Sequence, residues 1–282
     1  MGKVVQAPLG TEFEKDDLVV GIVRHPDPVP CPACAVGQWD MCRNGLYTER
    51  GIKQRDGFGS EFYTVEPTHL VKIDPSLGIL GVLLEPTTVV AKAWEQVEKI
   101  GNRAYWDPHK VVVIGAGPIG LLAALLGVQK GLDVYVVDVV NTGLKPDLVQ
   151  QLGAHYYVGP LSPVLKDADV VIECSGVGHV VFDVIENVGS YSVVCLTGVS
   201  ASGTHLDLDV GAISRGVVLE NQTVVGSVNA NRTHYEMAAK ALDKADKDWL
   251  GKIITRKVHI DNFEQAFEHN VDDVKVIIEF LH

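Results

Sequence analysis

The fold of this chain is decided by one stretch, Val111-Val112-Val113-Ile114-Gly115-Ala116-Gly117-Pro118-Ile119-Gly120. Its four β-branched residues form a continuous apolar run, which is typical of a strand that a parallel sheet buries on both faces. The glycines follow at once in the spacing Gly-x-Gly-x-x-Gly, and the apolar stretch Leu121–Lys130 begins directly behind them. A strand, a glycine turn and a helix in this order predict a dinucleotide-binding unit.

Each glycine of the turn has a separate task. Gly115 permits the tight turn, Gly117 lets the backbone approach a pyrophosphate without a Cβ in between, and Gly120 lets the helix pack closely on the strand. The N-terminus of that helix would face the diphosphate. The alternative is a glycine turn that serves packing alone. The predicted cofactor-binding residues of this turn are Gly115, Ala116, Gly117, Pro118, Ile119 and Gly120.

Asp138 follows a second apolar strand, Val134–Val137, and stands eighteen residues beyond Gly120. A carboxylate at this position accepts hydrogen bonds from the hydroxyls of the adenosine ribose. The 2′-phosphate of NADP would meet a like charge there, and the next three residues supply no arginine, although Lys145 lies within reach. Asp138 is therefore predicted to bind the cofactor and to favour NAD over NADP.

The rest of the chain supports a doubly wound α/β architecture. With 282 residues, 46% of them apolar and 21% charged, the chain is long enough for two folded domains. Helical patterns over Val89–Ile100 and Leu121–Lys130 alternate with apolar runs, as expected for a parallel sheet with crossover helices. Further buried strands are predicted at Ala168–Ile172, Ser192–Leu196 and Thr223–Val225.

The two ends of the chain have a different texture. Before Glu85, short β-rich runs are separated by Pro and Gly clusters, which predicts an irregular β module with few helices. After Asn229, an amphipathic stretch, His234–Leu242, precedes two strand-like runs, of which the last, Val274–Phe280, is expected to pair within the chain or across a dimer. The predicted strands of the two ends are Leu18–Val23, Glu61–Val65, His69–Ile73, Ile253–His259 and Val274–Phe280.

Charge and hydropathy exclude several classes of partner. The formal net charge is −12 and no basic run stands out, so nucleic acid and anionic membrane surfaces are not expected partners. The longest apolar stretches, such as Leu121–Val128, are too short to cross a bilayer, and the first residues lack the pattern of a secretion signal. A cytoplasmic protein without a membrane segment is expected.

Three of the five cysteines are clustered. Cys31-Pro-Ala-Cys34 and Cys42 have the spacing of three of the four ligands of a structural zinc loop, and Pro28 stands where a fourth cysteine would fall. His25 and Asp27 are the nearest upstream candidates for the missing ligand. The alternative is a loop of reduced thiols without metal, and a redox pair is disfavoured because no thioredoxin-like pattern surrounds it.

Several other runs, combined with the Cys-Pro-x-Cys loop and the glycine turn, resemble the zinc-type medium-chain dehydrogenase/reductases. Within that family the resemblance is greatest to the glucose 1-dehydrogenases, and it spans nearly the whole chain. The runs that carry it are Cys42-Arg-Asn-Gly45, Tyr47-Thr-Glu49-Arg50-Gly51-Ile52, Asp56-Gly57-Phe58-Gly59-Ser60-Glu61-Phe62, Leu83-Leu84-Glu85-Pro86 and Gly226-Ser227-Val228-Asn229.

The resemblance implies a domain plan and an activity. It implies an incomplete GroES-like catalytic domain over residues 1–90, a Rossmann domain over 91–228, and a segment over 229–282 that returns toward the catalytic domain. The implied reaction is NAD(P)-dependent oxidation of an aldose at C1 to the lactone, with zinc as Lewis acid, in a homodimer or homotetramer. The sequence does not encode which sugar is oxidised.

The resemblance also implies substrate residues. Glu49 would bind sugar hydroxyls, Glu85 would act at the catalytic zinc or the substrate, and Asn229 would lie near both the nicotinamide and the sugar. A carboxylate suits vicinal hydroxyls because it accepts two charge-assisted hydrogen bonds at once. The alternatives are an exposed ion pair between Glu49 and Arg50, a strand terminator at Glu85-Pro86, and a turn residue at Asn229.

The main departure from the family lies at the first residues. Gly2-Lys3-Val4-Val5 resembles the segment that follows the family's Gly-His-Glu zinc motif, so neither that motif nor the earlier Cys or Asp ligand is present. A sequence begun too late is the favoured explanation, and a short protein that has lost catalysis is the other. The functional alternatives to a sugar dehydrogenase are a catalytically silent dinucleotide-binding protein and a zinc-stabilised interaction module built on the Cys31 loop.

Overall fold

The computed structural model describes residues 1–203, 205–268 and 270–280. It consists of two compact units, one formed by Val90–Val228 and the other by Met1–Val89 together with Asn229–His282.

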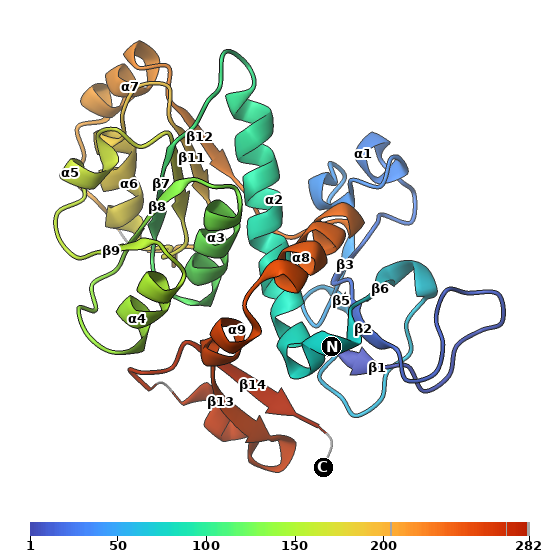
Figure 1. Cartoon of the computed structure of the whole chain (residues 1–282). Coiled ribbons are helices and arrows are strands. Elements are labelled where there is room, and N and C mark those ends of the chain that lie inside the picture. Colours follow the sequence, from blue (N-terminus) through green and yellow to red (C-terminus); the bar gives the residue numbers. More distant parts are fainter. Residues whose placement is uncertain (204, 269, 281–282) are drawn as a thin grey trace. The chain divides into compact units, whose positions relative to one another are not determined.

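A six-stranded sheet forms the centre of the Val90–Val228 unit, and its strand order is β12-β11-β10-β7-β8-β9 (Figure 1). Every neighbouring pair is parallel. The predicted α/β class and doubly wound parallel sheet are confirmed. The short strand β9 was not anticipated, because three residues are too few to show a pattern. The strands are β7 (Lys110–Ile114), β8 (Asp133–Val137), β9 (His155–Tyr157), β10 (Val170–Glu173), β11 (Val193–Leu196) and β12 (Thr223–Gly226).

Helices cover both faces of this sheet, with α3 and α4 on one side and α5, α6 and α7 on the other (Figure 1). The strands are buried because their valines and isoleucines pack under both helix layers; Val112, Val171 and Val194 are fully inaccessible to solvent. The helices are α2 (Leu84–Gly101), α3 (Pro118–Gln129), α4 (Leu144–Gln151), α5 (Ser162–Leu165), α6 (Gly178–Asn187) and α7 (Val210–Leu219).

The N-terminal part of the other unit is built from short strands in two three-stranded sheets, as the irregular β module predicts. One sheet has the order β1-β2-β6 and the other the order β3-β4-β5. Helical structure before residue 75 is limited to α1 (Pro32–Ala35) and two 3-10 turns among the described residues. The strands are β1 (Gly2–Lys3), β2 (Leu18–Gly21), β3 (Arg24–His25), β4 (Thr48–Arg50), β5 (Gln54–Arg55) and β6 (Leu70–Lys72).

The predicted strand Glu61–Val65 is wrong, because the segment has no strand assignment in the structure. A turn precedes it, in which Ser60 N–H donates to the Phe58 carbonyl oxygen. The Tyr63 ring then packs against the Phe58 ring, with centroids 4.8 Å apart. The aromatic residues that suggested a strand here serve ring packing instead of a backbone ladder.

Helix α2 begins at Leu84, five residues before the predicted start at Val89. The Glu85-Pro86 pair lies in its first turn, where the missing N–H of a proline leaves no helical hydrogen bond unmade. The interpretation of this pair as a strand terminator is therefore wrong.

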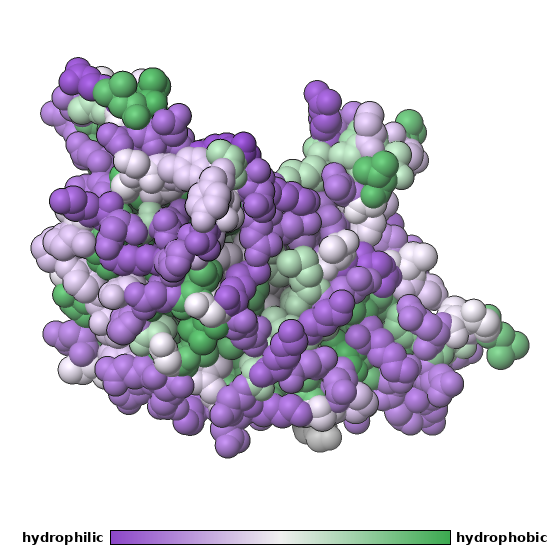
Figure 2. Space-filling view, turned by 45° about the horizontal axis from the view of Figure 1, so that its top comes forward, coloured by the Kyte–Doolittle hydropathy of each residue, from purple (hydrophilic) through white to green (hydrophobic). Residues whose placement is uncertain are grey.

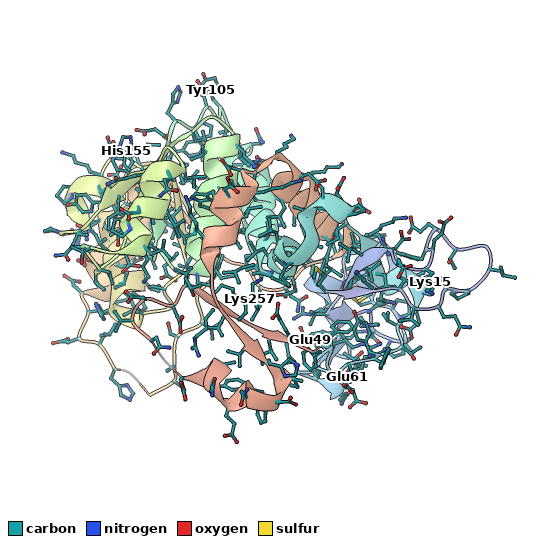
Figure 3. The ribbon with its side chains drawn as sticks, turned by 60° about the horizontal axis from the view of Figure 1, so that its bottom comes forward. Lys15, Glu49, Glu61, Tyr105, His155 and Lys257 are labelled. Carbon is teal, nitrogen blue, oxygen red and sulfur yellow. The ribbon has the colours of Figure 1, made fainter. Side chains whose placement is uncertain are left out.

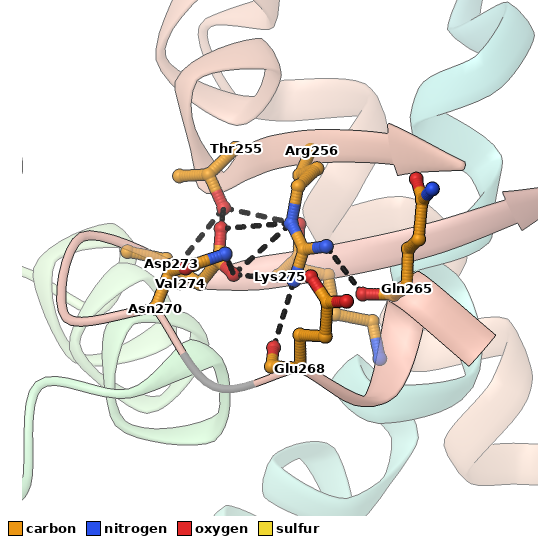
Figure 4. A network of polar contacts seen from close by, with 8 residues as sticks. All are labelled: Thr255, Arg256, Gln265, Glu268, Asn270, Asp273, Val274 and Lys275. Carbon is orange, nitrogen blue, oxygen red and sulfur yellow. Dashed lines mark hydrogen bonds and ion pairs between the residues drawn. The ribbon is translucent and has the colours of Figure 1, made fainter. Parts of the chain in front are cut away.

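The C-terminal segment consists of α8 (Arg232–Lys244), α9 (Lys247–Ile253) and the parallel pair β13 (Ile254–His259) and β14 (Lys275–Glu279). Of the two pairings left open for the last strand, the structure has the one within the chain. A polar network closes the connection between the two strands (Figure 4). Arg256 donates to the Asp273 carboxylate with an Nη2 to Oδ2 distance of 2.7 Å, and to the backbone oxygens of Gln265 and Glu268.

One helical stretch has the length and composition of a membrane span. The 3-10 segment Pro75–Leu83 runs into α2, and together they form 27 residues, longer than any apolar stretch expected from the sequence. Within its apolar window 61% is buried inside the protein, and the core helix of a soluble protein has the same properties. In Figure 2 hydrophilic residues cover most of the visible face, and apolar residues occur in scattered patches.

Candidate functional site

The glycine turn lies at the carboxyl end of β7, between that strand and α3. Gly115 has a φ of +97°, which L side chains rarely adopt, and its N–H donates to the Val137 carbonyl oxygen at 2.7 Å. A Cβ on Gly120 would lie 1.7 Å from the Gly115 carbonyl oxygen, whereas a Cβ on Gly117 would meet nothing within 4 Å. Gly120 is thus required for packing, and Gly117 leaves open space in front of the helix N-terminus.

Asp138 lies beside this turn at the end of the neighbouring strand β8. Its Oδ2 accepts from the backbone N–H of Ala116 at 2.7 Å, and its Oδ1 accepts from the N–H of Val139 at 2.7 Å. The Lys145 ammonium is 3.3 Å from Oδ2. The structure therefore brings the glycine turn, Asp138 and Lys145, which the sequence placed within reach, together at the carboxyl ends of β7 and β8.

The Asp138 carboxylate is held in its charged form. Partial burial by itself would raise its pKa, but hydrogen bonds from the backbone N–H groups of Ala116 and Val140 bring the pKa below its usual value overall. The nearby Lys145 acts in the same direction. At neutral pH the residues beside the turn therefore include a carboxylate with an adjacent cation, a combination suited to ribose hydroxyls.

Glu49 and Asn229, two of the expected sugar-binding residues, are in contact in the structure. Asn229 Nδ2 donates to Glu49 Oε1, which also accepts from Arg24 Nε at 3.0 Å. Glu49, labelled in Figure 3, is only 6% exposed. The alternative of an exposed Glu49–Arg50 pair is therefore wrong: the partner is Arg24, and Arg50 donates to the Thr64 backbone oxygen. No sequence signal pointed to Arg24, because a pair 25 residues apart follows no helical or strand spacing.

Asn229 and Glu85 differ in how the backbone holds them. Asn229 has a φ of +63°, a left-handed conformation that asparagine tolerates better than most residues, so it is also a turn residue. Glu85 is exposed in the first turn of α2. Desolvation by the surrounding protein raises the pKa of Glu85, and Lys275 partly opposes that rise.

The three clustered cysteines converge, with their sulfur atoms all within 4.8 Å of one another. Hydrogen bonds from backbone N–H groups, that of Arg43 foremost, lower the pKa of Cys31 to about 6. Burial raises the pKa of Cys34 to about 11. Sulfur atoms gathered in this way and supported by backbone donors fit a thiophilic metal ion such as zinc.

Neither upstream candidate completes this cysteine set. Asp27 uses one carboxylate oxygen to accept from Val29 N–H at 2.9 Å and the other to accept from Asn44 Nδ2 at 2.8 Å. His25 stacks on His69 instead, with ring centroids 3.8 Å apart. The cluster supplies three sulfur ligands, and Asp27 closes the loop by hydrogen bonds. The other two cysteines, Cys174 and Cys195, lie in the other unit.

A second group of possible ligands was missed by sequence reasoning. His25, Glu66 and His69 bring one ligand atom each within 4.8 Å of the others, but the imidazole rings are nearly parallel and their lone pairs do not converge. Within residues 1–203, 205–268 and 270–280, the cysteine cluster and this group are the only sets of three such ligands. Neither contains Glu85, so the described residues do not assemble the catalytic zinc site that the family resemblance implies.

Comparison with known proteins identifies the family. A family model described as the glucose dehydrogenase C-terminus matches residues 78–280. The chain belongs to the glucose dehydrogenase family. It is 35% identical to glucose 1-dehydrogenase of Methanocella arvoryzae, over 99% of this chain and 79% of the relative. It is 34% identical to glucose 1-dehydrogenase of Halobacterium salinarum, over 98% of this chain and 80% of the relative.

Solved structures agree with this assignment. Haloferax mediterranei glucose dehydrogenase in complex with NADP, Zn and gluconolactone superposes with a TM-score of 0.90 at 32% identity, over 100% of this chain and 81% of that one. Galactitol-1-phosphate dehydrogenase from Escherichia coli gives a TM-score of 0.78 at 24% identity, over 94% of this chain and 77% of that one, and supports the fold. The predicted membership of the zinc-type medium-chain dehydrogenases is confirmed, as is the resemblance to the glucose 1-dehydrogenases within that family.

Proposed function

We propose that this protein is an NAD(P)-dependent dehydrogenase that oxidises an aldose at C1 to the lactone. The observation that carries the proposal is the glycine turn with Asp138 beside it, found in a chain 35% identical to a glucose 1-dehydrogenase. In this reaction the C1–H bond breaks, and its electron pair travels as hydride to C4 of the nicotinamide. The C1 hydroxyl releases its proton, so the products are a lactone, the reduced cofactor and one proton.

The residues of this chain contribute binding and orientation. The open space at Gly117 and the N-terminus of α3 would receive the pyrophosphate, and Asp138 would accept from the adenosine ribose. Glu49 and Asn229, already hydrogen-bonded to each other, would offer acceptors and a donor to sugar hydroxyls. Glu85 is proposed as the catalytic carboxylate, because desolvation raises its pKa above the ordinary value of a glutamate and so favours the exchange of a proton.

A second candidate function is a dinucleotide-binding protein without turnover. It is favoured by the glycine turn and Asp138, which offer a dinucleotide site whether or not turnover follows. The test is to mix the chain with NAD or NADP, glucose and Zn²⁺ and to follow the absorbance of the reduced nicotinamide, with cofactor binding measured by calorimetry on the same sample. Glucose-dependent reduction supports the dehydrogenase, binding without reduction supports the silent protein, and absence of binding contradicts both.

We propose NAD as the preferred cofactor, with NADP accepted. Asp138 would repel a 2′-phosphate, but Lys145 at 3.3 Å supplies a compensating cation. The Haloferax relative is in complex with NADP, which supports use of both cofactors. Asp138→Ala should weaken NAD and improve the relative affinity for NADP, and Lys145→Ala should weaken NADP more than NAD. Unchanged affinities in both variants would contradict this account.

We propose that Cys31, Cys34 and Cys42 hold a structural zinc ion. Zinc there would cross-link the loop, because three protein bonds to one ion restrict the unfolded chain. Cys34→Ser should lower the zinc content by one ion per chain, measured by elemental analysis, without changing NAD affinity. A fall in NAD affinity would favour the view that the loop supports the fold as a whole, and loss of binding to a protein partner would favour an interaction module.

We propose a homodimer or homotetramer that acts in the cytoplasm. Strand β12 is an edge of the six-stranded sheet, and the neighbouring helix α7 exposes Val210, Val218 and Leu219, each by 68% or more. A second copy adding its own β12 would pair both edges and cover these side chains. Val218→Asp should convert the oligomer to a monomer in light scattering. No two of the five cysteines, all of them described, are joined by a disulfide, and this supports the proposal of a reducing compartment.

A further inference from the structure

Glu173, the last residue of β10, carries a carboxylate that the proposed chemistry does not use. It is 0% exposed although the rest of β10 is apolar. In the sheet it is paired with Ile114 of β7 on one side and with Leu196 of β11 on the other. A fully buried carboxylate is tolerated only when the surrounding groups satisfy its oxygen atoms, so its partners indicate what it is there to hold.

The side chain binds the loop that follows its own strand. Oε1 accepts from the backbone N–H of Ser175 at 2.7 Å, from the N–H of Gly176 at 3.0 Å, and from the Ser175 hydroxyl. The Ser175 hydroxyl oxygen in turn accepts from Val177 N–H at 3.2 Å. The carboxylate thus fixes three consecutive residues of a loop whose Ser175 and Val177 are exposed.

The backbone of Glu173 binds the next loop of the sheet. Its carbonyl oxygen accepts from Thr197 N–H at 2.8 Å, from the Thr197 hydroxyl at 2.8 Å and from Gly198 N–H at 3.1 Å. A Cβ on Gly198 would lie 2.2 Å from the Gly176 nitrogen, so the loops after β10 and β11 touch backbone to backbone. Glu173 therefore binds the loop after β10 through its carboxylate and the loop after β11 through its carbonyl oxygen.

These loops adjoin the glycine turn. A Cβ on Gly115 would lie 3.4 Å from the Ser175 nitrogen, so the β10 loop rests against the start of the pyrophosphate turn. The strand order places β8, with Asp138, on one side of β7, and β10 and β11 on the other. A dinucleotide whose adenosine ribose lies at Asp138 and whose diphosphate lies at the glycine turn must direct its nicotinamide half toward the loops after β10 and β11.

We propose that Glu173 is a positioning residue for the nicotinamide half of the cofactor. Its carboxylate holds the backbone of Ser175–Val177, and its carbonyl oxygen holds Thr197 and Gly198 of the adjoining loop, in the shape that receives the nicotinamide ring. The carboxylate acts through these loops and does not touch the cofactor. The inference rests on the proposed dinucleotide function and adds a residue whose loss affects one half of the ligand.

The test compares two probes on the full chain, NAD and ADP-ribose, which lacks only the nicotinamide ring. The adenosine, the diphosphate and both riboses are common to the two probes, so their affinity ratio reports the nicotinamide end. Glu173→Ala should weaken NAD by about tenfold or more and ADP-ribose by about threefold or less, since it removes three hydrogen bonds from one loop. Glu173→Gln should lose less NAD affinity relative to ADP-ribose than Glu173→Ala does, because an amide oxygen can accept the same hydrogen bonds without charge.

Ser175→Ala is the second variant, because it removes one contact of the carboxylate from an exposed position and leaves the core filled. It should lower NAD affinity by about threefold with ADP-ribose unchanged, and it decides the matter if Glu173→Ala does not fold. An equal loss for both probes would overturn the proposal in favour of a general structural role, as would unchanged affinities in all variants. If the unmodified chain binds neither probe, the dinucleotide function itself fails.

Discussion

The parallel sheet of Val90–Val228 and the segment Arg24–Arg50 are stabilised in opposite ways. The six strands bury valine and isoleucine on both faces, and among their described residues Glu173 is the only fully buried carboxylate. Between Arg24 and Arg50 the strands are two or three residues long, and the buried side chains include three carboxylates, an arginine and a histidine. Burial of apolar side chains stabilises the first region, whereas hydrogen-bonded polar groups, including the buried Arg24–Glu49 ion pair, stabilise the second.

This difference has a physical consequence for substitutions. Apolar burial is non-directional, so a sheet of this kind tolerates exchanges among valine, isoleucine and leucine that preserve volume. A buried ion pair is directional, and removal of one partner leaves the other charge without compensation. Replacement of single buried polar residues in the segment Arg24–Arg50 should therefore strongly reduce stability. In the sheet unit, only substitutions at positions where two backbone segments touch should do so.

Arg24→Met should give the largest effect. Arg24 Nε binds Glu49 Oε1 at 3.0 Å, with both side chains less than 10% exposed, and Nη1 donates to the Asp40 backbone oxygen. Methionine fills the space but leaves the Glu49 carboxylate uncompensated, at a cost of about 3–5 kcal/mol. Hydrogen exchange of the amides of residues 24–50 measures the loss locally. The double variant with Glu49→Gln should recover much of it; no recovery would mean that packing, and not charge, is responsible.

Gly120→Ala tests the backbone contact of the sheet unit. The new Cβ would lie 1.7 Å from the Gly115 carbonyl oxygen, so the turn or α3 must move, at a cost of about 3 kcal/mol. Thermal unfolding and NAD binding should both suffer. Gly117→Ala is the matched control, because its Cβ meets nothing within 4 Å: it should unfold normally and yet lose NAD affinity. Equal behaviour of the two variants would contradict the separate roles assigned to these glycines.

Acid should destabilise the Arg24–Arg50 segment through His25. Burial, and then His69, Arg55 and Arg50, lower the pKa of His25 from 6.5 to about 4, against a smaller opposite effect of Glu66. Because the folded pKa lies below the unfolded one, the unfolded chain binds the proton first as the pH falls. The contribution is therefore complete above about pH 6.5 and is lost progressively toward pH 4, to a total of roughly 3 kcal/mol.

Chemical denaturation across that pH range measures the effect. His25→Phe is the matched control, since Nε2 is buried without a hydrogen-bond partner and a phenyl ring preserves the stack on His69. The stability of this variant should depend less on pH between 4 and 6.5. A profile as steep as that of the unmodified protein would assign the acid sensitivity to other groups, with His69 the first candidate, because burial lowers its pKa as well.

The sheet unit could be predicted because its information is local. The strand Val111–Ile114, the glycine spacing and Asp138 follow one another along the chain, and each has a physical reason that can be stated without the rest of the fold. Glu173 shows the limit of this approach. In the sequence it is one acidic residue after an apolar run, and only the register that places Leu196 and Ile114 beside it reveals that it serves two loops.

The charged region could not be predicted, because its partners are distant in sequence. Glu49 binds Arg24 and Asn229, which are 25 and 180 residues away. No periodicity encodes such pairs, so the sequence alone suggests only the neighbouring Arg50 as an ion-pair partner for Glu49. The spacing of Cys31, Cys34 and Cys42 is the exception: a short loop confines thiols that are close in sequence, and the sulfur atoms do converge.

Arg256→Lys should have the smallest effect of the predicted substitutions. It tests whether directional polar contacts also stabilise the C-terminal segment. The guanidinium binds the Asp273 carboxylate and two backbone oxygens from a partly exposed position, and an ammonium can keep the ion pair but not all the bonds. The expected cost is about 1 kcal/mol, measured by hydrogen exchange of β13 and β14.

Lys257→Ala on the same strand is the control, since its 3.9 Å contact with Glu279 is exposed and should contribute almost nothing. If the two variants behave alike, hydrogen-bond geometry is unimportant here, and the contrast between the two modes of stabilisation is confined to buried pairs such as Arg24–Glu49.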